Sequence, residues 1–192
     1  MMDALTKVLL TVSNALLVPD VLLLLVFMAL TILYLGGMMA EAAERWRYGR
    51  PFWKYVADLK REPGRRVQLH DVPARHGFPA KVLSVFSPGA KEKWVDDTQL
   101  AMEASLARLN MGIRLGPLLG LAGTLIPLGP ALEGLSTGNI AVLSQSLVVA
   151  FTTTVAGLFI GGLSYVMYSI RQRWYAQDLN DLEFILERMG NS

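Results

Sequence analysis

The sequence contains no cysteine and only two histidines among 192 residues. The absence of cysteine excludes disulfide bonds and thiolate metal ligands. His70 and His76 have no clustered carboxylates around them in the sequence, so we expect surface histidines, no metal site and no cofactor. The sequence also lacks HExxH, GxSxG and a glycine-rich phosphate loop, so we do not expect an enzyme.

Charged residues are scarce as well. They make up only 18% of the chain, whereas 53% of the residues are hydrophobic and the mean hydropathy is +0.38. Residues 21–40, 115–132 and 134–170 carry no charge at all. A composition of this kind is typical of an integral membrane protein and argues against a large independent soluble core.

The uncharged stretches predict an all-α membrane protein with three transmembrane helices. About 20 helical residues, rising 1.5 Å each, cover the roughly 30 Å hydrocarbon core of a bilayer. We place these helices at residues 18–40, 111–133 and 140–170, and a polar Gly-Leu-Ser-Thr-Gly-Asn turn at residues 134–139. The third stretch is longer than a simple span requires, so part of its helix is expected to extend beyond the membrane.

The remaining segments are expected to lie outside the bilayer. Residues 1–17 resemble an amphipathic surface helix, and Pro19 and Asp20 suit the first turn of the membrane helix that follows. Residues 41–110 are predicted to form a largely helical cytoplasmic region, and residues 171–192 a cytoplasmic C-terminal helix with a regular apolar stripe.

Lysine and arginine are distributed very unevenly along the chain. One precedes the first span, fourteen lie between the first and second spans, none lies in the turn at residues 134–139, and three follow the third span. The positive-inside rule therefore predicts a multi-pass protein of the inner (plasma) membrane with its N-terminus outside and its C-terminus in the cytoplasm. Acidic residues are interspersed with the basic ones, so a nucleic-acid partner is not expected.

Small residues recur every three or four positions along the second and third apolar stretches. Glycine at this spacing lets membrane helices approach one another closely. We therefore expect two helix-packing faces, with Gly116, Gly120 and Gly123 on one helix and Gly157 and Gly161 on the other.

Two motifs overlap these glycines: Pro117-Leu-Leu-Gly-Leu-Ala-Gly-Thr124 and Thr154-Val-Ala-Gly-Leu158. In them the chain resembles the MotA/TolQ/ExbB proton channel family, whose last two membrane helices carry Pro-x-x-Gly-Leu-x-Gly-Thr and Thr-x-x-Gly-Leu. With three spans and a short cytoplasmic region, the chain is more similar to the TolQ/ExbB plan than to MotA. One departure is Val149, which stands where TolQ- and ExbB-like members often have a glutamate.

The resemblance implies that Thr124 and Thr154, together with the adjacent Thr153, line a pore. From the residues alone, each hydroxyl could instead bond to a carbonyl three or four positions back in its own helix. Successive helical residues are about 100° apart, so Thr153 and Thr154 do not point in one direction. Glu133, at the outer end of the second span, has two interpretations as well: an interfacial charge or a residue of the ion access route.

The function that the resemblance implies is that of a stator or energy-transducing channel subunit driven by the proton-motive force. Such subunits form a homo-oligomeric ring, with five copies as the family precedent, around the membrane helix of a single-span MotB/TolR/ExbD-like partner. Residues 115–132 and 140–170 contain no titratable carboxylate or histidine, so the partner is expected to supply the titrating aspartate. The alternative is a structural or signalling membrane scaffold without ion flux.

Overall fold

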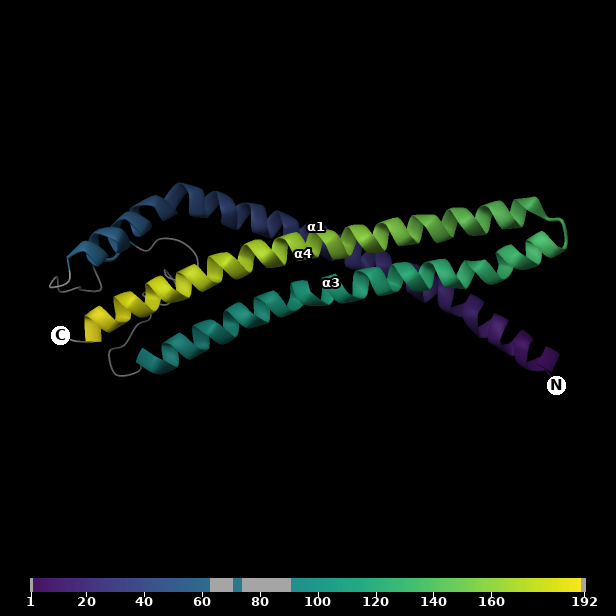
Figure 1. Ribbon diagram of the computed structural model, residues 1–192, viewed down its shortest axis with the longest axis horizontal. Helices are drawn as coiled ribbons and strands as arrows, with labels where there is room; N and C mark the ends of the chain where they lie inside the picture. The colour runs from purple at the N-terminus through teal and green to yellow at the C-terminus, as the bar shows by residue number, and fades with distance from the viewer. Residues whose placement is uncertain (1, 63–70, 74–90, 191–192) are drawn as a thin grey trace. The chain divides into compact units, whose positions relative to one another are not determined.

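The computed structural model describes residues 2–62, 71–73 and 91–190. These residues form three long α-helices: α1 (Met2–Arg61), α3 (Lys91–Ser136) and α4 (Ile140–Gly190) (Figure 1). Each contains a segment long and apolar enough to cross a membrane. The all-helical fold class and the presence of three candidate spans, as predicted from the sequence, are thereby confirmed. His70 and His76 lie outside the described residues.

Helix α1 has no break at Pro19, where the sequence suggested that a surface helix (residues 1–17) gives way to a membrane helix (residues 18–40). A single helix runs from Met2 to Arg61, which puts Asp20 inside it rather than in its first turn. Residues 8–18 are uncharged, so the helix has apolar residues on both sides of Pro19. A break at Pro19 would leave several backbone groups without hydrogen bonds in apolar surroundings, whereas a continuous helix loses only the one hydrogen bond that proline removes.

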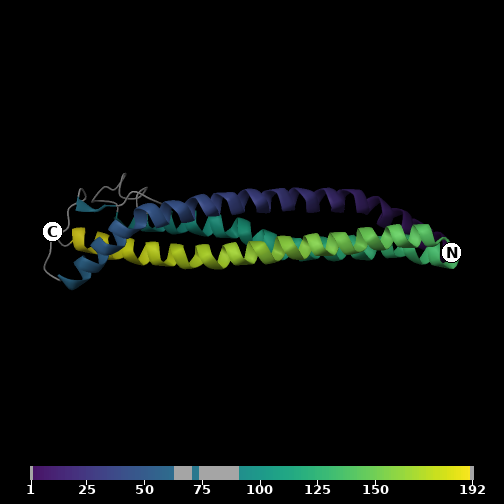
Figure 2. The ribbon, with the colours of Figure 1, turned by 90° about the horizontal axis from the view of Figure 1, so that it is seen from above.

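The chain divides into two compact units. Unit 1 consists of Met1–Tyr34 and Arg108–Met167, and unit 2 of Leu35–Ala107 and Tyr168–Ser192. In unit 1, α3 and α4 lie side by side and antiparallel, and the N-terminal end of α1 lies at the same end of the unit as their connection (Figures 1 and 2). The buried apolar side chains of this unit include Leu24, Ile160 and Met167.

The connection between α3 and α4 is shorter than the predicted turn at residues 134–139, because α3 continues to Ser136. The Asn139 amide donates to the Gly134 carbonyl at 2.7 Å, and the Asn139 side chain accepts from the Val142 amide at 3.2 Å, which caps α4. Gly138 has a φ of 71°, a conformation that glycine adopts without a Cβ penalty. Local capping and one glycine thus reverse the chain between the two helices.

Unit 2 combines an apolar core with a buried polar cluster. The core packs Phe52, Val56 and Leu59 of α1 against the C-terminal part of α4, where Leu182, Ile185 and Leu186 are fully buried. The apolar stripe predicted at the C-terminus therefore packs against α1 of the same chain.

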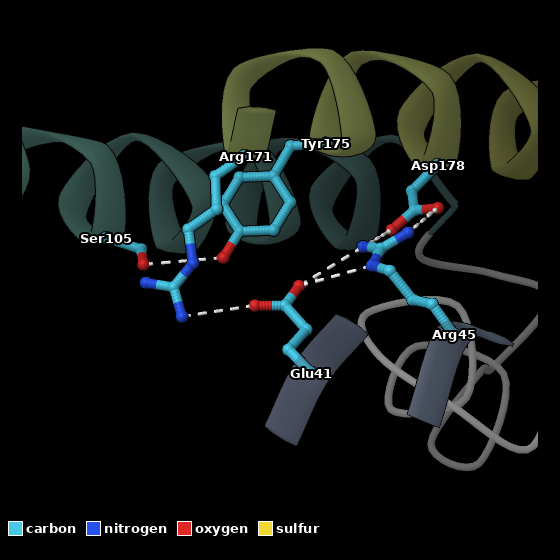
Figure 3. Close-up of polar contacts among 6 residues, drawn as sticks. All are labelled: Glu41, Arg45, Ser105, Arg171, Tyr175 and Asp178. Atoms are coloured by element: carbon cyan, nitrogen blue, oxygen red, sulfur yellow. Dashed lines mark hydrogen bonds and ion pairs between the residues drawn. The ribbon is translucent and has the colours of Figure 1, made fainter. Parts of the chain in front are cut away.

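The polar cluster of unit 2 links α1 to α4 (Figure 3). Arg45 donates hydrogen bonds to both carboxylate oxygens of Asp178, and Glu41 bridges Arg45 and Arg171. The Arg45 guanidinium also lies 4.9 Å from the centre of the Trp174 ring. Burial opposes the charge on Arg45, but the hydrogen bond and the charge of Asp178 outweigh this effect and raise the pKa of Arg45 above its ordinary value.

Candidate membrane site of unit 1

The glycines of α3 and α4 lie where these two helices pack closely together. A Cβ atom on Gly157 would lie 2.5 Å from the Gly116 carbonyl oxygen and 2.7 Å from the Gly120 Cα. A Cβ atom on Gly161 would lie 2.8 Å from the Pro117 ring. Any side chain at these positions would meet backbone or ring atoms that cannot rotate away. The structure therefore brings together the glycines that the sequence placed on two packing faces.

Thr124 and Thr154 lie near this contact and are both half-buried. The Thr154 hydroxyl lies 3.1 Å from the Ala150 carbonyl of its own helix and 3.5 Å from the Gly120 carbonyl of α3. Thr124 follows Gly120 by one helical turn, on the same face of α3, and donates to the Leu121 carbonyl at 2.7 Å. Both hydroxyls thus keep an intrahelical hydrogen bond while part of each side chain stays accessible.

Thr153 lies in different surroundings from Thr154. It is only 6% exposed and its hydroxyl bonds to the carbonyls of Val149 and Ala150, at 3.0 and 2.9 Å. A Cβ atom on Gly123 would lie 2.6 Å from the Thr153 hydroxyl oxygen and 3.0 Å from Oδ2 of Asp20. The Thr153 side chain is therefore enclosed within unit 1, between α3 and α1, whereas Thr124 and Thr154 remain partly accessible.

Asp20 is the residue of this site that the sequence reasoning missed. Its side chain is 7% exposed, and it lies against Gly123 of α3. The signal was present in the sequence: between Lys7 and Glu41, a stretch of 33 residues, Asp20 is the only charged residue. Because Pro19 precedes Asp20, the sequence suggested that a helix starts here. An acid in the first turn of a helix is usually exposed to solvent, so nothing indicated that Asp20 is buried.

Glu133 lies at the other end of the apolar segment. Its side chain is exposed near the end of α3, and its backbone carbonyl accepts hydrogen bonds from the hydroxyls of Ser136 and Thr137. No ion pair involving Glu133 is present within the described residues. Its position leaves both interpretations from the sequence open, an interfacial charge and a residue of the ion access route.

The fold and this site define a multi-pass membrane protein in which two glycine-packed helices present threonine hydroxyls inside an uncharged segment. The model of the MotA/TolQ/ExbB proton channel family matches residues 88–183, which cover half of the chain, all of α3 and most of α4. The chain belongs to this family, and membership implies an energy-transducing proton channel role. Neither the curated proteins nor the solved structures compared with the chain gave a match. Helix α1 and Asp20 lie outside the matched region.

Proposed function

We propose that this chain is the ring-forming subunit of a machine driven by the proton-motive force. Several copies, five by family precedent, surround the membrane helix of a single-span MotB/TolR/ExbD-like partner, whose aspartate carries the transported proton. The family match supports the proton channel role. The observation that carries the proposal is the position of Thr124 and Thr154, which are partly exposed on two packed helices whose apolar segments contain no charge.

The exposed surface of unit 1 supports assembly. Large apolar side chains are exposed on all three helices, among them Leu22, Leu25, Leu118, Leu121, Val155 and Leu158. In a membrane these side chains face lipid or the helices of other subunits. A hydroxyl-bearing surface is poorly suited to lipid and gains from a protein-lined or hydrated lumen, which a ring provides.

In this arrangement the threonines do not carry the proton. A threonine hydroxyl does not ionise at accessible pH, but it can donate and accept hydrogen bonds at the same time. We infer that Thr124 and Thr154 align water and bond to the protonated carboxyl group of the partner as the subunits move past it. The lysine and arginine distribution supports an orientation with the N-terminus outside and unit 2 in the cytoplasm.

A comparison of neighbouring threonines tests the proposal. Thr154→Val keeps the volume and removes the hydroxyl, so we expect it to lower proton flux through the chain with its partner and to leave ring size unchanged. Thr152→Val is the matched control: Thr152 also donates to its own helix, to the Val148 carbonyl at 2.7 Å, but it lies about 200° around α4 from Thr154.

Two measurements test these expectations, one of ring size and one of proton flux. Native mass spectrometry should give a multiple of the 21.1 kDa chain mass for the wild type and both variants. Flux in proteoliposomes should fall for Thr154→Val and further for Thr124→Val combined with Thr154→Val. A monomeric particle that is active, or full flux in the double variant, would refute the proposal.

A further inference from the structure

Asp20 of α1 is an acid buried within unit 1. Its side chain is more than nine-tenths buried, and within the described residues Oδ2 has no hydrogen-bond partner. An ionised carboxylate in such a place is costly unless a cation or several donors compensate for it. The acid therefore needs either a neutralising ion or a proton.

Within the described residues, no charged side chain pairs with Asp20 on the helices that pack against it. It lies against Gly123, which is near the middle of the uncharged residues 115–132 of α3, and beside Thr153 in the uncharged residues 140–170 of α4. On α1 itself, the nearest charged residues in the sequence are Lys7 and Glu41, each more than three helical turns away. The charged residues of α3 nearest to Gly123 are Arg114 and Glu133, nine and ten residues along the helix, so each lies more than two helical turns from the position that Asp20 contacts.

The surroundings of Asp20 are apolar as well. A groove of about 490 Å³ in unit 1 is lined mainly by apolar side chains of α1 and α4, including Val21, which follows Asp20 in the sequence, and it also reaches Thr153. In a membrane such a groove holds lipid chains or apolar side chains rather than bulk water. Solvation by water is therefore weak at this position.

The neighbouring hydroxyl can accept a hydrogen bond but has no hydrogen left to donate. A threonine hydroxyl has one hydrogen and two lone pairs. The hydrogen of Thr153 is directed at the carbonyls of Val149 and Ala150. A Cβ atom built on Gly123 would lie 2.6 Å from the Thr153 oxygen and 3.0 Å from Asp20 Oδ2. Both oxygens therefore face the same space above Gly123, which has no side chain to fill it. An acceptor at this place matches the O–H of a carboxylic acid and does not stabilise a carboxylate.

We propose that Asp20, Thr153 and Gly123 form a proton-binding site within the subunit, and that Asp20 takes up and releases a proton during transport. In the bound state the Asp20 carboxyl group is neutral, and the Thr153 oxygen is the nearby acceptor toward which its O–H turns. Release leaves the carboxylate and passes the proton to water or to another acid. The transport role rests on the proposed function, whereas proton binding at Asp20 is a property of the chain alone. The site is separate from the Thr124 and Thr154 surface and adds a titrating group to the one expected on the partner.

Infrared difference spectroscopy between neutral and alkaline pH tests the binding step without any partner. For the purified chain in lipid we expect the carbonyl band of a protonated acid at neutral pH, lost at alkaline pH. The band should be absent in Asp20→Asn, shifted in Asp20→Glu, and unchanged in Asp97→Asn, which alters an exposed acid of α3. If no acid band depends on Asp20 at neutral pH, or if sodium removes the band at constant pH, the proposal is overturned. If Asp20→Asn does not fold, the wild-type and Asp20→Glu spectra still test whether Asp20 binds a proton.

Proton flux with the partner tests the transport step. We expect Asp20→Asn to lower flux by about 100-fold, the lower end of what a positioned proton-transfer group contributes, with ring mass unchanged. Asp97→Asn should keep full flux. If Asp20→Asn assembles and retains full flux, the transport role of Asp20 is overturned while the proposed function stands. If neither the variants nor the wild type conduct protons, the proposed function and the transport role of Asp20 both fail. The infrared spectra then still test whether Asp20 binds a proton.

Discussion

Arg45 and Asp178 form a buried ion pair that joins α1 to α4 in unit 2. The two hydrogen bonds measure 3.0 and 2.5 Å, and the Asp178 side chain is 1% exposed (Figure 3). A bidentate pair of this kind fixes the rotation of one helix against the other, because both donors and both acceptors must meet in one plane. Since the pKa of Arg45 is raised above its ordinary value, the arginine stays charged at every pH at which the protein is handled.

Removing one partner of this pair should destabilise the protein strongly. Asp178→Leu leaves the Arg45 charge buried without its main partner, and we expect a loss of about 3 to 5 kcal/mol in the free energy of unfolding. The double variant Arg45→Met with Asp178→Leu should recover most of this loss. Lys60→Met is the control, because Lys60 pairs with Asp181 but is 52% exposed, so the loss should be below about 1 kcal/mol. Denaturant unfolding in mild detergent compares these three variants with the wild type; equal losses for Lys60→Met and Asp178→Leu would contradict the account.

The packing of α3 against α4 predicts a difference between two glycines only five residues apart. Gly157→Ala would place a Cβ atom 2.5 Å from a backbone oxygen, so we expect the helices to separate, with a cost of about 1 to 3 kcal/mol. A Cβ atom on Gly162 would meet no neighbouring element within 4 Å, so Gly162→Ala should be neutral or slightly stabilising, as alanine favours helix. Thermal unfolding in detergent separates the two; identical midpoints would argue against close packing at Gly157.

The orientation can be tested with single cysteines, because the chain has none of its own. Ser136 and Asp97 are both exposed, the first at the α3–α4 connection and the second near the start of α3. Ser136→Cys should react with an impermeant thiol reagent added outside the cell, and Asp97→Cys only after the membrane is opened. Labelling of both from the same side would contradict the topology that the lysine and arginine distribution predicts.

The sequence was a good guide to the helices because length and charge determine which segments can enter a membrane. Residues 115–132 and 140–170 stand out by the absence of charge, and glycine spacing indicated which faces pack together. The resemblance to the family motifs indicated Thr124 and Thr154 as candidate pore residues. What the sequence could not determine was where α1 packs. Pro19 looked like a helix start, and only the contact with Gly123, about a hundred residues away, reveals Asp20 as buried.

The pairing of charges in unit 2 was likewise beyond the sequence. Arg45 and Asp178 are 133 residues apart, and the same segments contain other acids and bases that could have paired equally well. Which of them meet depends on the rotation of each helix, and this rotation depends on the core packing around Phe52 and Ile185 as well as on the ion pair itself. Long-range pairing of this kind becomes visible only in three dimensions.

Proton flux in proteoliposomes distinguishes a channel that needs a partner's aspartate from a scaffold and from a channel formed by the chain alone. The purified chain is reconstituted alone, with its single-span partner, and with a partner whose membrane aspartate is changed to asparagine. We expect flux only for the chain with the intact partner, because one buried acid in each subunit does not make a continuous path across the bilayer. Flux through the chain alone at the rate of the complete complex, or no flux through the complete complex, would contradict it.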